Sequence, residues 1–106
     1  VNDFIFTVSE EGFLIVIDSK SGKIIRSTDV FDKFKIKKRK KIKPTGFVLG
    51  SKKLYLSTST GRLLIVDIET GKTQSIIKID SEKISRPIIL KQSLFVVKNN
   101  SVIKLN

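Results

Sequence analysis

The stretch LYLSTSTGRLLIVDIETGKTQS, residues 54–75, decides the fold because the chain contains it in more than one copy. An earlier copy, IFTVSEEGFLIVIDSKSGKII, occupies residues 5–25, and a shorter one, LFVVKNNSVIKLN, occupies residues 94–106. In the shorter copy Asn106 takes the position of Asp67. The first two copies share matched residues at one spacing of 49 (61 − 12): Gly12 and Gly61, Asp18 and Asp67, Gly22 and Gly71, Lys23 and Lys72. Regular self-similarity of this kind indicates a repeat architecture.

Each copy has the pattern of antiparallel strands. Residues 54–59 are rich in β-branched and aromatic side chains and lead into a glycine turn. Residues 63–68 are apolar at almost every position, as expected of a strand that is covered on both faces of its sheet. Residues 72–79 then alternate polar and apolar side chains, which favours an outer, partly solvated strand. A short apolar run also precedes two of the copies, at residues 47–50 and 87–90.

The loops between these strands have the composition of tight hairpin turns. Asp18 and Asp67 open the sequences DSKSGK and DIETGK, where their carboxylates can accept hydrogen bonds from backbone N–H groups. Gly22 and Gly71 then provide the positive φ that such loops need before the chain re-enters the sheet. We therefore expect six residues to have structural roles in turns: Asp18, Gly22, Asp67, Gly71, Gly12 and Gly61.

These segments predict an all-β chain with three strands, then four, then three. Repeated four-stranded antiparallel sheets that cover each other's faces are typical of a β-propeller, so we predict a propeller fragment of about two and a half blades. A β-sandwich is the alternative for ten short strands, but the matched turns favour the propeller. The predicted parts of this single unit are an incomplete first blade at 1–34, a basic insertion at 35–46, a complete blade at 47–82 and an incomplete last blade at 83–106.

Composition limits the chemistry that the chain can perform. Its 106 residues are enough for one small domain, and its short apolar runs, broken by charges, predict no membrane span. It contains no cysteine and no histidine, so a disulfide framework, a thiol nucleophile and the commonest general base are all missing. We therefore predict that the chain is not an enzyme and has no catalytic, cofactor-binding or metal-binding residues. Its first residue, Val1, further predicts a processed or excised piece of a protein.

Most of the net charge of +11 comes from the segment 33–43, KFKIKKRKKIK, which has eight basic residues and no acidic ones. Three interpretations are open. The segment is a solvated loop between blades whose lysines reflect coding bias; or it contacts an anionic surface, either lipid head groups or an acidic protein; or it binds nucleic acid. No aromatic residue is interleaved through 35–43 to stack on bases, which disfavours nucleic acid. The candidate contact residues are Lys35, Lys37, Lys38, Arg39, Lys40, Lys41 and Lys43.

The sequence LYLSTSTGRLLIVDIETGK resembles the PQQ-type propeller repeat, in which an aromatic-rich strand, a glycine turn, an apolar strand and a D-x-x-[ST]-G-K turn recur. The order of segments is most similar to the C-terminal blades of the BamB family of outer-membrane assembly lipoproteins. This resemblance implies a non-catalytic scaffold in the periplasm, at the inner face of the outer membrane if the parent is a lipoprotein. Its implied partners are proteins of the outer-membrane β-barrel assembly machinery. A PQQ-like repeat domain with some other role is the alternative.

The chain departs from the family pattern in two respects. Many PQQ-type repeats have a tryptophan shortly after the G-K of the turn, which docks one blade on the next, whereas this chain has Arg26 and Ser75 there. The resemblance thus implies that isoleucine, leucine and phenylalanine pack the blades. Nothing equivalent to the quinone- and calcium-binding residues of the PQQ dehydrogenases is present, so no cofactor is expected. Because the first and last predicted blades each lack a strand, we expect self-association through unpaired blade edges.

Overall fold

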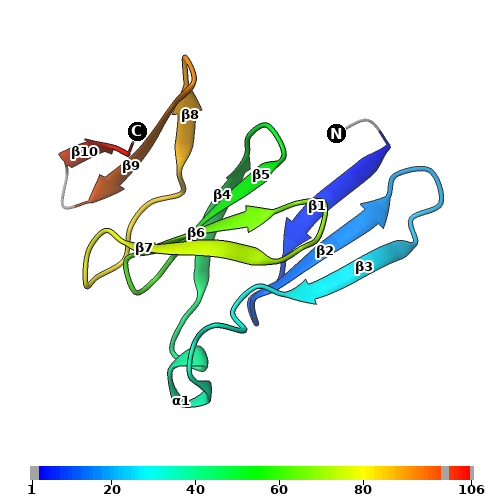
Figure 1. Ribbon diagram of the computed structural model, residues 1–106, viewed down its shortest axis with the longest axis horizontal. Helices are drawn as coiled ribbons and strands as arrows, with labels where there is room; N and C mark the ends of the chain where they lie inside the picture. The colour runs from blue at the N-terminus through cyan, green and yellow to red at the C-terminus, as the bar shows by residue number, and fades with distance from the viewer. Residues whose placement is uncertain (1–2, 99–100, 106) are drawn as a thin grey trace.

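A computed structural model describes residues 3–98 and 101–105 of the chain (Figure 1). Asn106, which the sequence places in the position of Asp67, lies outside the described residues. The described part contains ten strands and one short helix. They are β1 (Phe4–Val8), β2 (Phe13–Asp18), β3 (Ile24–Asp29), α1 (Ile36–Arg39), β4 (Pro44–Leu49), β5 (Lys53–Thr58), β6 (Arg62–Asp67), β7 (Thr73–Lys78), β8 (Ile88–Leu90), β9 (Ser93–Lys98) and β10 (Ser101–Lys104).

The strands form three antiparallel sheets that follow one another along the chain, as Figure 1 shows. Their strand orders are β1-β2-β3, β4-β5-β6-β7 and β10-β9-β8. Each strand pairs with its neighbour in sequence, so every sheet is a simple meander joined by hairpins. The predicted succession of three, four and three strands is therefore what the described residues adopt. We refer to the three sheets as the first, middle and last blade.

The first two copies of the repeat share their hydrogen bonds as well as their residues. The N–H of Asp18 donates to the carbonyl of Lys23 at 2.9 Å, and that of Asp67 donates to Lys72 at the same distance. Both copies also have a register shift at the same place, between Val16 and Ile17 in β2 and 49 residues later in β6. The sequence repeat is thus a structural repeat down to its irregularities.

The core lies between the first and the middle blade. Leu14 of β2 and Leu64 of β6 are completely buried, and they belong to one cluster with Phe31 and Ile42 of the connecting segment. Leu63 precedes Leu64, points to the opposite face of the sheet and is also completely buried. The middle blade is therefore covered on both faces, which explains why its β6 strand is apolar at successive positions.

The structure differs from expectation in the segment that connects these blades. A single helical turn, α1, stands where a loop was expected, and β4 begins at Pro44, inside the range 35–46 that the sequence assigned to the insertion. Within residues 3–98 and 101–105 no helix has the length and apolar character needed to cross a bilayer. Phe31, which precedes the basic segment, is completely buried.

Candidate functional site

Arg26 joins the first blade to the middle blade. It lies on β3, and its two terminal nitrogens donate hydrogen bonds to the carbonyls of Ile68 and Glu69 in the turn after β6. This is the position at which many PQQ-type repeats have a docking tryptophan. Isoleucine, leucine and phenylalanine pack the boundary between the first and the middle blade, as expected. The guanidinium of Arg26 adds a polar contact across this boundary, which we call the seam.

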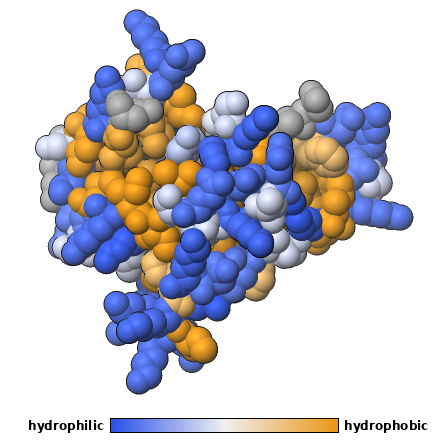
Figure 2. Space-filling view, viewed as in Figure 1, coloured by the Kyte–Doolittle hydropathy of each residue, from blue (hydrophilic) through white to orange (hydrophobic). Residues whose placement is uncertain are grey.

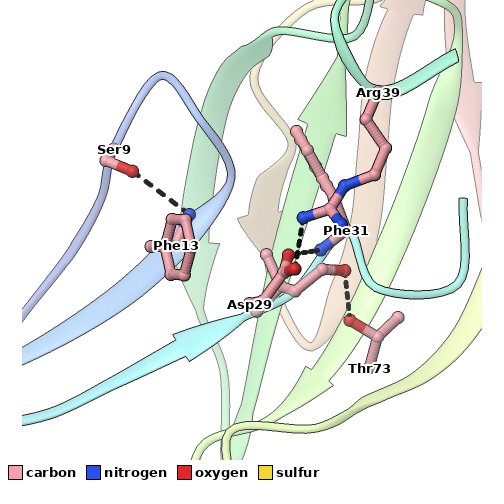
Figure 3. Close-up of polar contacts among 7 residues, drawn as sticks. Ser9, Phe13, Asp29, Phe31, Arg39 and Thr73 are labelled. Carbon is pink, nitrogen blue, oxygen red and sulfur yellow. Dashed lines mark hydrogen bonds and ion pairs between the residues drawn. The ribbon is translucent and has the colours of Figure 1, made fainter. Parts of the chain in front are cut away.

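The same seam requires glycine at position 71. Gly71 has a φ of 75°, and a Cβ added there would overlap the side chain of Thr28 on β3. Next to it, the Thr73 hydroxyl donates to the carbonyl of Val30 at 2.7 Å (Figure 3). Gly22 has nearly the same φ, 73°, but no atom lies within 4 Å of a Cβ added there. Two glycines that the repeat makes equivalent thus differ in what surrounds them.

The other predicted turn residues lie where the repeat places them. Oδ1 of Asp18 accepts from the N–H of Lys20 and Oδ1 of Asp67 from that of Glu69, each at 2.9 Å. Gly12 and Gly61 end the preceding turns, and a Cβ added at either would overlap a residue from elsewhere in the chain. These residues shape hairpins and blade contacts, and the structure does not gather them into one site.

An apolar cleft of about 510 Å³ opens beside Arg26. Phe4, Phe6 and Ile25 of the first blade line it, together with Ile68 and the residues 50–52 between β4 and β5. Phe4 and Ile25 remain largely exposed. The cleft can therefore hold an apolar group at the edge of the seam.

The basic segment 33–43 is the second candidate site, and its Arg39 is anchored to the first blade. Figure 3 shows that Arg39 forms an ion pair with Asp29 at the end of β3. The other carboxylate oxygen of Asp29 accepts from the N–H of Phe31 at 3.0 Å. Of the seven candidate contact residues, Arg39 is therefore engaged inside the protein.

Apolar contacts hold the rest of the segment in place. The ring of Phe34 packs edge-on against Phe31, with ring centres 5.6 Å apart, and Ile42 is almost completely buried. Lys43 exchanges two hydrogen bonds with Ser59, one through each of its main-chain polar groups. The segment is thus a projection with defined contacts to the fold on its inner side.

The candidate lysines, by contrast, face solvent and take part in none of the ion pairs found among the described residues. Lys38 and Lys41 line a hollow of about 310 Å³ with Arg62 and Thr60, above an apolar floor of Phe34 and Ile42. On another side, Glu10 and Glu11 share a hollow with Arg39, Lys40 and Lys43 and offset part of the charge. The lysines exposed in this segment are Lys33, Lys35, Lys37, Lys38, Lys40, Lys41 and Lys43.

The residues that sequence reasoning missed are Arg26 as a blade contact, and Asp29 with Phe31 as anchors of the basic segment. Their partners lie 42 or 43 residues away for Arg26 and ten residues away for Asp29. The sequence offered one indication, which is that Arg26 occupies the position of the docking tryptophan in PQQ-type repeats. A side chain at that position is expected to contact the next blade.

Successive antiparallel meander sheets, here of three, four and three strands, are typical of a β-propeller, and solved propellers superpose on the chain. One is BamB from Moraxella catarrhalis, with a TM-score of 0.69 and 13% sequence identity over 98% of this chain and 29% of that one. The WD40 propeller domain of Doa1 has a TM-score of 0.70 at 12% identity, over 97% of this chain and 32% of that one. These matches confirm the all-β propeller fragment.

A third solved structure is the quinohemoprotein alcohol dehydrogenase ADHIIG from Pseudomonas putida HK5, with a TM-score of 0.69 and 16% identity over 91% of this chain and 15% of that one. BamB and this dehydrogenase bear out the predicted resemblance to PQQ-type repeats. No family model matches the sequence, and no curated protein sequence matches it. At these identities the likeness shows the fold, and the chain spans about a third or less of each of the three structures.

Proposed function

We propose that the chain is part of a non-catalytic protein-binding scaffold that takes part in outer-membrane β-barrel assembly in the periplasm. The observation that carries the proposal is the superposition on BamB, which extends over 98% of the chain and so includes all three blades. The order of complete and incomplete blades supports it, since the sequence resembles the C-terminal blades of that family. The structure adds exposed blade surfaces, which suit protein contacts.

A scaffold suits the chemistry of the chain. The sequence has no histidine and no cysteine, and the described residues contain no cluster of three acidic side chains that could hold a metal ion. The cleft beside Arg26 has mainly apolar walls. An apolar cleft with few polar groups is suited to binding a side chain of a partner more than to proton transfer.

The proposal is tested in the organism that encodes the chain, by an in-frame deletion of the 106 codons. We expect less folded β-barrel protein in the outer membrane, measured by electrophoresis with and without heating, and we expect a second copy of the gene to restore it. A tagged parent protein is expected in the periplasmic or outer-membrane fraction. Unchanged barrel levels, or a parent protein in the cytoplasm, would contradict the assembly role.

The terminal blades carry most of the exposed apolar surface. In the part of the chain described, Ile77 is the large apolar residue of the middle blade that is exposed, whereas the first and last blades expose many. These residues are Phe4, Ile5, Phe13, Ile24, Ile25, Ile88, Leu90, Val97 and Val102. Apolar blade faces pack against neighbouring blades in a propeller, so they are available to further blades or to a second copy.

We therefore predict that the 106-residue chain, prepared alone, forms dimers or larger species. The measurement is molar mass by light scattering behind size-exclusion chromatography, at about 50 μM, where contacts of standard interface size are populated. A double variant, Ile24→Lys and Val102→Lys, places charges among the exposed apolar residues of the first and last blades and is expected to shift the population toward monomer. A monomeric parent chain at this concentration would argue against self-association through the blades.

A further inference from the structure

The segment 33–43 forms a projection that stands away from the three blades. Figure 1 places α1 at the lower end of the molecule, beyond the ends of the strands. In Figure 2 this end is mostly blue, with a small orange area on one side. A basic projection with an exposed apolar residue is a distinct surface feature, and nothing in the scaffold proposal uses it.

The inward side of the projection is fully committed to the fold. Arg39 is paired with Asp29, Phe34 packs on Phe31, and Ile42 is 4% exposed. These contacts use the single arginine and the single aromatic residue of the segment. What remains for a partner is a set of lysines and one aliphatic side chain.

That aliphatic side chain is Ile36, which is 78% exposed. It belongs to α1, and its neighbours in the sequence are Lys35 and Lys37, both of which are exposed. An isolated exposed isoleucine needs no explanation on an ordinary surface. Here the other apolar residues of the segment, Phe34 and Ile42, pack against the fold, whereas Ile36 does not.

We propose that this projection docks on an anionic lipid bilayer, with its lysines at the head groups and Ile36 inserted at the boundary with the acyl chains. Lysines near an anionic membrane attract it without requiring any particular geometry, which fits a set of flexible point charges. An exposed apolar side chain amid basic ones is the combination that interfacial segments use. The hollow beside Lys38, Lys41 and Arg62 can receive a head-group phosphate. This inference does not rest on the proposed scaffold function.

Two other partners fit the surface less well. Nucleic acid is disfavoured because Phe34 is packed on Phe31 and is not free to stack on a base. An acidic protein is disfavoured because lysine is depleted in protein interfaces and the fork of Arg39, which suits carboxylates, is already engaged. Both remain as outcomes of the test.

The test is cosedimentation of the 106-residue chain with vesicles of phosphatidylcholine that contain about one-third phosphatidylglycerol, at about 0.1 M salt, where the Debye length is about 10 Å. We expect binding to these vesicles and little binding to pure phosphatidylcholine. The variant K35Q/K37Q/K38Q is expected to bind about 100-fold more weakly, since each lysine near an anionic surface contributes about fivefold. Ile36→Ser is expected to weaken binding about fivefold, because the inserted apolar area is lost.

The matched control is K20Q/K23Q/K72Q, which removes the same charge from exposed hairpin turns outside the projection. We expect this control to bind like the parent chain within about threefold, since its lysines lie beyond the screened range of the bilayer. Because Ile36 and the substituted lysines are exposed, the variants should retain the far-ultraviolet circular dichroism of the parent.

Three results would overturn the inference. The first is no binding to the anionic vesicles at about 0.1 M salt, because at this salt concentration surface charges still interact over about 10 Å. The second is an equal loss in the projection variant and the control, which would mean that only net charge matters. The third is tighter binding to duplex DNA or to polyglutamate than to vesicles with no effect of Ile36→Ser, which would assign the surface to nucleic acid or to an acidic protein.

Discussion

Replacing Gly71 with alanine is expected to lower the free energy of unfolding by about 3 kcal/mol, whereas the same change at Gly22 should cost only about 1 kcal/mol. The two glycines are equivalent in the repeat and have φ values of 75° and 73°. Alanine therefore meets the same backbone penalty at both positions, about 1 kcal/mol. The difference in unfolding free energy between the two variants therefore reports the packing around each glycine.

At position 71 the added methyl group would overlap Thr28 on β3, whereas at position 22 it meets nothing within 4 Å. Thr28 belongs to the first blade, whereas residue 71 belongs to the middle blade. The overlap can therefore be relieved only if the turn or the first blade moves. Overpacking of this kind costs about 1–3 kcal/mol in addition to the backbone term.

The measurement is urea denaturation at one fixed protein concentration, because self-association would otherwise change the apparent stability. The double variant G71A/T28S is the further control, since it removes a methyl group that lies close to the added Cβ. We expect this double variant to recover part of the unfolding free energy that Gly71→Ala loses. An equal loss of unfolding free energy in the Gly71→Ala and Gly22→Ala variants would show that the first blade does not pack closely against the turn at Gly71.

Arg26→Ala is expected to destabilise the chain by about 3 kcal/mol, since each hydrogen bond from a charged donor contributes about 1.5–3 kcal/mol and this side chain is only partly buried. The lost bonds are those to the carbonyls of Ile68 and Glu69, the contacts that join the first blade to the middle one. Because the contact lies between blades, we expect the amide hydrogens of β3 to exchange faster than those of β5.

The matched control for Arg26 is Ser75→Ala, at the equivalent position of the middle blade, where the side chain is exposed. It should change stability by less than about 0.5 kcal/mol. Arg26→Met keeps the aliphatic stem and removes the guanidinium. We expect this variant to lose most of the unfolding free energy that Arg26→Ala loses. If methionine were as stable as arginine, the stem would hold the seam and the two carbonyl contacts would contribute nothing.

The fold was predictable because its strongest signals are local. Alternating and continuous apolar runs identify strands, and the DSKSGK and DIETGK turns set hairpins whose backbone bonds depend on residues four or five positions apart. The boundaries were less predictable. β4 begins at Pro44, three residues before the apolar run that suggested it, because its first residues pair with β5 through a register shift that no local pattern reveals.

The candidate sites were predictable only in part. The cluster of basic residues was evident from composition, and so were the residues that could contact an anionic surface. The sequence did not show which of these residues are available to a partner. Arg39 pairs with Asp29 and Phe34 packs on Phe31, and both contacts depend on the tertiary structure. Arg26 gave a signal only as a departure from the family pattern.

By itself the sequence determined the class of fold, the number and order of strands and the hairpin turns, since each of these follows from interactions among residues that are close along the chain. Only the tertiary structure decided which glycine is irreplaceable, how the blades are held and which side of the basic segment faces outward. Those outcomes depend on contacts between residues far apart in the sequence, such as Arg26 with Glu69 and Thr73 with Val30. Local periodicity carries no information about such contacts.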